Sequence, residues 1–444
     1  MAMTEVGTAS APITHRRVLA IALPIVLSNA TVPILGAVDV GVVGQMGQAA
    51  PIGAVGIGAV ILASVYWIFG FLRMGTSGLV AQAYGAGDVV ESGAVLGRAL
   101  LIGLVAGAGF ILLQGALAWA AFQIAPASAE VEALARRYIG IRIWGAPATI
   151  ALYAITGWLI AVERTRAVLV LQLWINGVNI GLDLWFVLGL GWGVPGVAGA
   201  TLIAEWTGLG LGLWLCRDAF APGLHRAIRA RLADATRLRE MARVNTDIMI
   251  RSVVLQASFT TFVFLGAGQG DVTLAANQVL LQFLEITAYA LDGFAFAAES
   301  LVGQAVGARE RGRVRRASVL TSQWGVTGSV LLGLVFWFAG PGIIDLMAGD
   351  PAVQETARVY LPWVAIGPLI GIASWMFDGI FIGATLTREM RNAMLASVLV
   401  YVAALALLLP TLGNHGLWAS LAVLNTARGL TMAMFYPRVE AKAA

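Results

Sequence analysis

Ionisable side chains within long apolar segments are the residues of this chain best suited to chemistry. The segment PIVLSNATVPILGAVDVGVVG, residues 24–44, carries Asp39 among Val, Ala and Gly. A charge at the centre of a bilayer costs about 2.5–3.5 kcal/mol on insertion scales, so a carboxylate in such a segment indicates function. The other ionisable candidates in apolar segments are Arg73, Arg142, Asp183, Glu205, Arg251, Glu285, Asp292, Glu299, Asp378 and Arg428.

Polar side chains from three apolar segments are predicted to lie at one depth. Segment one runs outward from about residue 18, which places Asp39 in its outer part. Segment five also runs outward, and Asp183 lies about 24 Å along it at about 1.5 Å per residue. Thr201 lies two turns into segment six, which runs inward. On segment five, Asn176, Asn179 and Asp183 are spaced i, i+3, i+7 and share one face.

Two carboxyl groups at one depth, with amides and a hydroxyl beside them, can hold a cation. Because two buried like charges repel each other, Asp39 and Asp183 are suited to sharing a proton. The same oxygens can ligate Na⁺, and we expect no other metal and no prosthetic group. The alternative is a static polar network that holds the helices together.

The second half of the chain has its acids at other positions. Asp292 and Asp378 each precede a glycine and fall in the middle to inner half of their segments. Either aspartate can bind a cationic substrate or a cation, or can pair with Arg251 or Arg428. Four further charged residues are expected as pairs or extended side chains near the membrane interface: Arg73, Arg142, Glu205 and Glu299.

Two prolines interrupt the segment that carries Asp39. Pro24 and Pro33 each remove a backbone hydrogen bond and make that helix easier to bend. A bend beside a titrating aspartate is what a proton-driven hinge requires, whereas packing alone also produces kinked helices in membranes.

Bulk composition places the chain in a membrane and excludes several classes of soluble protein. It is 59% hydrophobic and 12% charged, with mean hydropathy +0.84, whereas soluble domains are about half apolar and about a quarter charged. The arginines cluster between apolar runs, so the positive net charge does not indicate nucleic-acid binding. The three histidines, at 15, 225 and 415, are far apart, and no Walker sequence or nucleophile–base pair is present. An enzyme or an ATP-driven pump would need such groups.

Twelve apolar runs are long enough to span a membrane, which needs about 20 residues. We expect an all-α integral membrane protein of two pseudo-symmetric six-helix bundles around a central cleft. The first bundle is expected over 1–216, a basic cytoplasmic linker over 217–244 and the second bundle over 245–444. Arginines concentrate at the N-terminus and in the even-numbered loops, which predicts that both termini are cytoplasmic. The predicted spans are 18–43, 52–81, 93–120, 133–161, 167–190, 195–216, 245–266, 273–304, 317–339, 354–384, 392–411 and 416–436.

The two bundles are predicted to be copies of one unit. LVAQAYGAG at 79–87 recurs as LVGQAVGAR at 301–309, an offset of 222 residues. The same offset aligns Tyr138 with Tyr360 and Gly157 with Gly379. Six helices are an even number, so the copies share one orientation, an arrangement found in transporters that work by alternating access. The offset places Leu405 opposite Asp183, so the scaffold is repeated while the acids are not.

Five segments resemble the multidrug and toxic compound extrusion transporters, in particular the DNA-damage-inducible F-type branch. The resemblance covers nearly the whole chain and rests on residues 22–47, 70–87, 176–201, 292–308 and 378–394. It implies twelve helices in two lobes and efflux driven by a proton or sodium gradient. It implies a cation site at Asp39, Asn179 and Asp183 with Thr201 in support, and bending of helix one at Pro24. Other branches use acids of helices seven and ten, but helix seven here has no membrane-centre acid, which favours the first-half site and leaves Asp378 open as a coupling residue.

The expected function is a bacterial inner-membrane antiporter that exports amphipathic, often cationic compounds in exchange for protons or Na⁺. Its expected partners are small organic substrates and the lipid bilayer, without nucleic acid, and we expect a monomer. An alternative is a lipid-linked precursor flippase of the same superfamily, which would line its cleft with cations. A weaker alternative is a regulatory membrane protein that transports nothing and tolerates loss of both aspartates.

Overall fold

The computed structural model describes residues 11–45, 49–124, 127–221 and 223–444, and within these ranges it contains helices and no strand. Ten helical stretches in this part of the chain are long and apolar enough to cross a membrane. Helices α11 (Val194–Leu215) and α18 (Asn414–Ala441) have 22 and 28 residues and occupy the sixth and twelfth predicted spans. The all-helical, multi-pass architecture predicted from the sequence is therefore confirmed.

The chain divides into two compact units that correspond roughly to its two halves. Two short segments of the first half, one near the N-terminus and one at 81–87, belong to the second unit. Within the described ranges, the first comprises residues from 27–80 and 88–240, and the second comprises residues from 11–26, 81–87 and 241–444. The boundary at residues 26 and 27 falls inside helix α2 (His15–Ala30).

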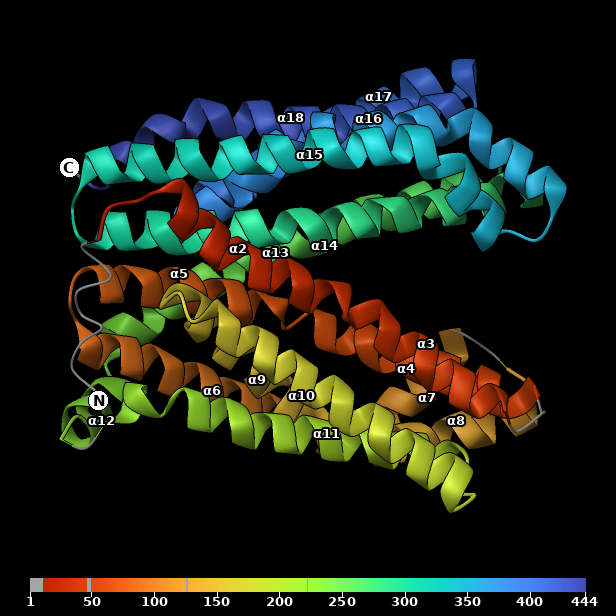
Figure 1. Ribbon diagram of the computed structural model, residues 1–444, viewed down its shortest axis with the longest axis horizontal. Coiled ribbons are helices and arrows are strands. Elements are labelled where there is room, and N and C mark those ends of the chain that lie inside the picture. Colours follow the sequence, from red (N-terminus) through yellow and green to blue (C-terminus); the bar gives the residue numbers. More distant parts are fainter. Residues whose placement is uncertain (1–10, 46–48, 125–126, 222) are drawn as a thin grey trace. The chain divides into compact units, whose positions relative to one another are not determined.

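Five of the six spans in the first half are interrupted (Figure 1). Span one breaks at Thr31 between α2 and α3 (Val32–Gly44), and span five changes at Asp183 from an α-helix into a π-helical turn. The remaining elements of this half are α4 (Ala49–Trp67), α5 (Gly70–Gly85), α6 (Val89–Leu112), α7 (Gln114–Ile124), α8 (Ala129–Arg142), η1 (Ile143–Gly145), α9 (Ala146–Ala161), α10 (Thr165–Asp183) and η2 (Leu184–Gly189). The breaks fall beside prolines in spans one and four, because proline cannot donate the helical hydrogen bond.

The second half consists of long, unbroken helices. They are α13 (Ala235–Ala267), α14 (Asp271–Gly307), α15 (Arg311–Met347), α16 (Pro351–Gly383), α17 (Thr387–Leu412) and α18. Helix α13 begins ten residues before the expected start at 245, so part of the expected linker is helical and continuous with span seven. The rest of that linker contains η3 (Arg217–Phe220) and α12 (His225–Leu232).

The internal repeat is visible in equivalent close helix contacts. A Cβ at Gly157 would lie 2.4 Å from the carbonyl oxygen of Arg73, and a Cβ at Gly379 would lie 2.2 Å from that of Ala295. These four residues form two pairs at the 222 offset, and in each pair only glycine permits the helix backbones to approach so closely. The offset therefore describes two copies of one helix packing.

The repeated QA-x-GA motif packs against its own second copy within the second unit. A Cβ at Gly85 would lie 2.0 Å from the carbonyl oxygen of Gln304, and a Cβ at Gly307 would lie 2.0 Å from that of Gln82. The two contacts are exchanged by the repeat, as expected for two copies related by a pseudo-two-fold axis. This is why both copies require glycine at this position of the motif.

Candidate functional site

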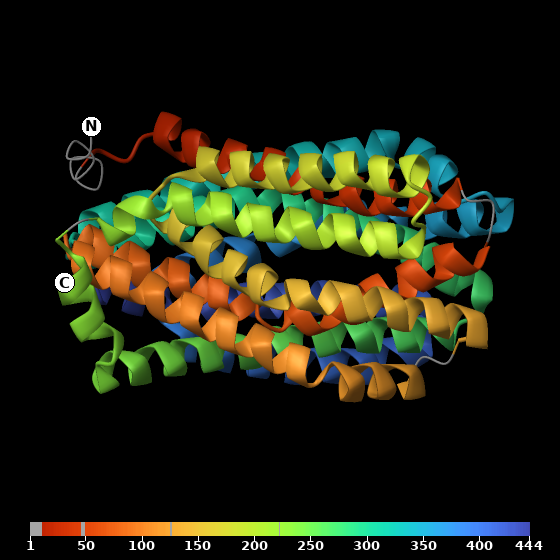
Figure 2. The same cartoon turned by 90° about the horizontal axis from the view of Figure 1, so that it is seen from below.

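The first unit brings four of the predicted site residues together. They come from α3 (Asp39), α10 (Asn179 and Asp183) and α11 (Thr201), and α10 and α11 lie side by side (Figure 2). Asn179 and Asp183 are fully buried and Thr201 is 6% exposed. Because Asn179 and Asp183 are one turn apart on α10, both point toward the same place. The site is therefore assembled from three separate spans of one unit.

The side-chain amide of Asn179 lies between both carboxyl groups and the threonine hydroxyl. With its nitrogen toward the acids, the amide donates to Asp183 Oδ2 at 3.1 Å and to Asp39 Oδ1 at 3.1 Å, and its oxygen accepts from Thr201 Oγ1 at 3.0 Å. This orientation satisfies ionised carboxylates, which only accept hydrogen bonds.

The opposite orientation of the same amide suits protonated acids. The Asn179 nitrogen then donates to Thr201 Oγ1 at 3.0 Å, and the Thr201 hydroxyl donates to the Val197 carbonyl at 3.0 Å. The amide oxygen faces the carboxyl groups and is satisfied only where these carry a proton to donate. The Asn179 amide can thus find hydrogen-bond partners in either charge state of the acids, which a site that binds and releases a cation needs.

Asp183 has unused capacity to accept. Its Oδ1 is buried and receives no hydrogen bond from any described residue, and the Asp39 and Asp183 carboxyl groups lie within hydrogen-bonding reach of each other. A buried acceptor without a donor is costly, so this oxygen is suited to a proton or a small hard cation. The described residues contain no group of three His, Cys, Asp or Glu side chains placed to hold a metal ion.

The helix that carries Asp183 changes its form directly after this residue. Asp183 is the last residue of α10, and the π-helical turn η2 follows at once, with the Leu190 N–H donating to the Trp185 carbonyl at 2.9 Å. A π-turn widens the helix and is frequent at functional sites. No residue pattern in the sequence predicted this turn.

Asn176 contacts the break in span one instead of the acids. Its amide donates to the Thr31 hydroxyl at 2.9 Å and to the Thr31 carbonyl at 3.3 Å, while Gln172 donates to the Asn176 oxygen at 2.9 Å. Pro33 lies at the second position of α3, directly after this break, and Pro24 lies inside α2. One face of α10 therefore contacts both the break and the acid pair. Thr31 was not a candidate in the sequence analysis, although a hydroxyl two residues before a proline was a usable signal.

Arg142 and Glu205, which were expected as ion pairs or extended side chains near the membrane interface, form an ion pair with each other, and both side chains are largely buried in the protein. Arg142 Nη1 lies 2.6 Å from Glu205 Oε2, and the two side chains are 12% and 10% exposed. A Cβ at Gly145 would lie 2.2 Å from Glu205 Oε2, so the 3₁₀ turn η1 makes room for the carboxylate. Arg142 also interacts electrostatically with Asp39 and Asp183. The first unit therefore contains a buried cation near the acids, which depth counting along the helices missed.

The aspartates of the second unit are in different surroundings. Asp378 Oδ2 accepts from Arg251 at 2.5 Å and from Arg428 at 2.8 Å, and all three side chains are buried. The sequence left Asp378 either as a group that binds a cation or as the partner of an arginine. In the structure it pairs with both arginines. Asp292 is half-buried on α14 and interacts electrostatically with Tyr289. Glu299 is fully buried on the same helix, so its side chain packs inside the protein and is not extended toward the surface.

Comparison with known proteins agrees with the repeated fold. The MatE family model matches the chain twice, over residues 24–185 and 248–408. The chain is 40% identical to DNA damage-inducible protein F of Escherichia coli (strain K12), over 94% of this chain and 91% of that protein. It is 24% identical to the probable multidrug resistance protein NorM of Neisseria meningitidis serogroup A, over 94% and 92% of the two chains.

Solved structures show the same fold at low sequence identity. The Vibrio cholerae MATE transporter VcmN in the bent form has a TM-score of 0.86 at 18% identity and covers 99% of each chain. An outward-facing multidrug resistance MATE family transporter of the MOP superfamily has a TM-score of 0.85 at 19% identity, over 100% of this chain and 99% of the other. The family model covers most of the chain in two copies. The protein therefore belongs to the MatE family, as its sequence motifs predicted, and is a multi-pass membrane transporter rather than an enzyme.

Proposed function

We propose that this protein is a secondary antiporter that exports amphipathic, often cationic organic compounds in exchange for protons or Na⁺. The observation that carries the coupling assignment is the Asn179 amide, which bridges Asp39 and Asp183 at 3.1 Å to each. The assignment is supported by the burial of Asn179 and Asp183 and by the two amide orientations of Asn179, one suited to ionised and one to protonated acids. The names of relatives, which include probable multidrug resistance proteins, support the substrate class.

The coupling ion would act through charge balance in a low-dielectric site. With both aspartates ionised, two negative charges repel each other, and binding one proton or one Na⁺ relieves this repulsion. Carboxylate, amide and hydroxyl oxygens of Asp39, Asp183, Asn179 and Thr201 are the ligand types that a hard cation prefers. The same groups serve a proton, so both ions remain candidates.

The break in span one is the proposed hinge that would move when the ion binds. Asn176 connects the break at Thr31 to the helix that carries Asn179 and Asp183. When the ion binds, the contacts of Asp39 with α10 change, and α3 would rotate about the break beside Pro33. Pro24, which interrupts the hydrogen bonds of α2, would supply a second bending point. This movement would couple ion binding to substrate release by alternating access.

The remaining elements of the proposal follow from charge distribution and the repeat. The two transport lobes would be 1–216 and 245–444, joined by the basic segment between them. Both termini would lie on the cytoplasmic side of the bacterial plasma membrane, where the arginines gather. The protein would act as a monomer, with organic substrates and lipid as its partners.

A lipid-linked precursor flippase is the second candidate, and one observation favours it. In the second unit, two buried arginines, Arg251 and Arg428, share the single carboxylate of Asp378. An excess of buried positive charge suits an anionic head group better than a cationic drug. We rank this candidate second because the acid site of the first unit is what a cation-coupled exporter needs.

Transport by purified protein in proteoliposomes tests the proposal. A pH gradient and a Na⁺ gradient are imposed separately, and efflux of a fluorescent organic cation is followed. Asp39→Asn should abolish gradient-driven efflux, whereas Asp271→Asn, an exposed aspartate at the start of α14, should not. Wild-type efflux by Asp39→Asn would overturn the coupling site. Flipping of a lipid-linked substrate without cation efflux would reverse the ranking of the two functions.

A further inference from the structure

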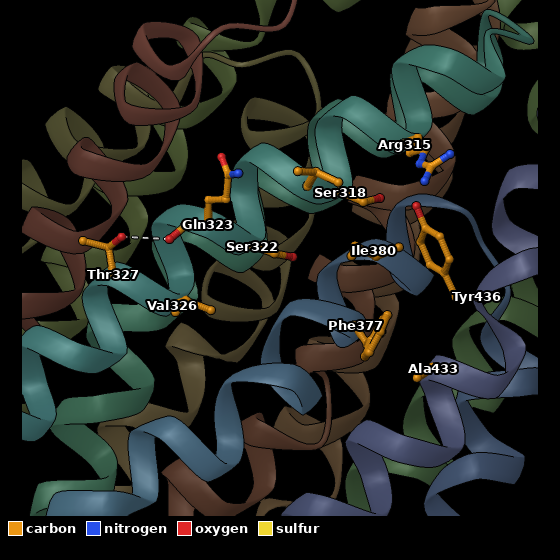
Figure 3. Close-up of a pocket in the computed structure, with 11 residues that line it drawn as sticks. Arg315, Ser318, Ser322, Gln323, Val326, Thr327, Phe377, Ile380, Ala433 and Tyr436 are labelled. Atoms are coloured by element: carbon orange, nitrogen blue, oxygen red, sulfur yellow. Dashed lines mark hydrogen bonds between the residues drawn. The ribbon is translucent and has the colours of Figure 1, made fainter.

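A groove lies between α15, α16 and α18 of the second unit, and none of its lining residues belongs to the acid site (Figure 3). Its volume is about 770 Å³, which is within the range of small-molecule sites, about 300–1,000 Å³. All three helices belong to one compact unit. The lining residues are Arg315, Ser318, Val319, Ser322, Gln323, Val326, Thr327, Phe377, Ile380, Ala433 and Tyr436.

One face of α15 forms the length of the groove. Seven lining residues between 315 and 327 recur at spacings of three and four, which places them in one stripe of the helix. Twelve residues span about 18 Å at about 1.5 Å per residue, close to half of the roughly 30 Å hydrocarbon core. Helix α15 has 37 residues, so its middle lies near residue 329. The groove therefore extends from the arginine-rich end of α15 to its middle, the depth of one lipid leaflet.

The side of the groove is open to the surroundings of the helices. Val319 and Val326, which line it, are 47% and 44% exposed. Its deeper walls are apolar, from Phe377 and Ile380 of α16 and Ala433 of α18, while hydroxyl groups of Ser318, Ser322 and Thr327 lie along α15 (Figure 3). An apolar opening along the side of a membrane-spanning helix is suited to contact with lipid chains.

The rim of the groove carries one uncompensated positive charge. Arg315 is exposed, and among the described residues no carboxylate forms an ion pair with it. The nearby Glu440 is 3.0 Å from Arg311, which already balances its charge. The Tyr436 hydroxyl lies next to Arg315 and within hydrogen-bonding contact of Ser318 and Glu440. None of the eleven lining residues is acidic, so the formal charge of the lining is positive and suits an anion better than an organic cation.

We propose that this groove binds an anionic phospholipid of the surrounding leaflet, with the phosphate at Arg315 and Tyr436 and one acyl chain along α15. Basic pockets between transmembrane helices are suited to acidic lipid head groups. The depth of one leaflet, the lateral opening and Arg315 at the head-group end, which has no ion-pair partner among the described residues, all match this ligand. The proposal does not depend on the coupling assignment, because the groove and the acid site lie in different units.

Fluorescence quenching by brominated lipids tests the proposal. Cys216 is the only cysteine and is buried. In a Cys216→Ala background, a single fluorescent label can therefore be attached to the thiol introduced by Val330→Cys. Val330 is 40% exposed, lies near the middle of α15 and does not line the groove. Reconstituted protein is titrated with phosphatidylglycerol or phosphatidylcholine brominated near the chain ends. Phosphatidylglycerol should quench with a relative affinity about fivefold higher, the factor expected from about one cationic side chain at an anionic head group.

Variants at the rim assign the selectivity to this groove. Arg315→Gln should remove the preference for phosphatidylglycerol, and Arg315→Lys should keep most of it. Arg388→Gln, which removes an equally exposed arginine from the first turn of α17, should leave the preference unchanged. Unchanged selectivity in Arg315→Gln, or equal quenching by both lipids in the wild-type background, would overturn the proposal. Relief of the quenching by an organic cation at concentrations that leave the bulk lipid unaltered would also overturn it and indicate a drug site.

Discussion

The side-chain amide of Asn176 donates to the hydroxyl of Thr31 at 2.9 Å and thereby joins α10 to the break in span one. A second bond from the same amide reaches the Thr31 carbonyl at 3.3 Å, which satisfies a backbone group that the break releases. Asn179 and Asp183 follow on the same face of α10. A single helix face thus contacts the two features on which coupling would depend, the acid pair and the point where span one bends.

Replacing Asn176 with Leu should uncouple these features without removing either aspartate. The Thr31 carbonyl would lose its partner, at a cost of about 1–3 kcal/mol for a buried unsatisfied group. We expect a lower midpoint of thermal unfolding in detergent and slower gradient-driven efflux at equal protein density. Gln172→Leu, one turn earlier and without contact to the break, is the control and should have the milder effect. Efflux at the wild-type rate in Asn176→Leu would show that the hydrogen bonds between Asn176 and Thr31 have no role in transport.

Removing one partner of the Arg142–Glu205 pair should destabilise the first unit strongly. Glu205→Gln leaves a buried guanidinium uncompensated, for which a cost of roughly 3–5 kcal/mol is expected. The double variant Arg142→Gln/Glu205→Gln removes both charges and should recover part of that loss. Glu132→Gln breaks the surface ion pair between Arg136 and Glu132, whose side chains are 40% and 32% exposed. Its loss should cost about 0–1 kcal/mol. Thermal unfolding followed by tryptophan fluorescence measures all three; equal losses in Glu205→Gln and Glu132→Gln would contradict the buried pairing.

Asp378 should act as the counter-charge of two arginines rather than as a free cation-binding carboxylate. Asp378→Asn leaves Arg251 and Arg428 facing each other without compensation, so the amount of folded protein after extraction should fall sharply. The triple variant Asp378→Asn/Arg251→Gln/Arg428→Gln carries no net buried charge there and should recover folded protein. Size-exclusion chromatography of the solubilised variants gives the readout. A stable Asp378→Asn variant that specifically loses binding of an organic cation would instead assign the carboxylate to the substrate.

The docking of α12 on the first turn of α6 should weaken in acid. Arg231 Nη1 lies 2.6 Å from Asp88 Oδ2. Burial by itself would raise the pKa of Asp88, but the hydrogen bonds from Arg231 and from the Glu91 N–H hold it below the ordinary value of 3.8. A carboxyl group with a lowered pKa stabilises the folded state above its ordinary pKa, and this stabilisation is lost as the pH falls through the lowered value.

Hydrogen–deuterium exchange of the α12 amides between pH 6 and pH 3 checks this expectation. After correction for intrinsic exchange, protection of α12 should decrease below about pH 4 in the wild type. Asp88→Asn should show reduced protection throughout and a flatter pH profile. The same steep loss of protection in Asp88→Asn would assign the acid sensitivity to another group.

Much of the candidate site was accessible from the sequence because helices convert spacing into geometry. The i, i+3, i+7 spacing placed Asn176, Asn179 and Asp183 on one face of α10, and rise per residue brought Asp39 and Thr201 to the same level. The same arithmetic did not identify Arg142 and Glu205 as partners of each other, because it supplies depth along a helix but not the direction in which a side chain points. The shared face also led to the prediction that Asn176 lies beside the acids, whereas it contacts Thr31. Residues on one face of a helix can contact different neighbouring segments.

The sequence by itself determined the membrane class, the number of spans and the internal repeat, because hydropathy and a constant offset are properties of order along the chain. The family followed from motifs for the same reason. Only the tertiary structure decided where the spans break, how the amide of Asn179 divides its hydrogen bonds, and that Asp378 is shared by two arginines. These features depend on which side chains from distant segments meet in a place without water. There, each polar group must find its partner among neighbours that spacing alone does not identify.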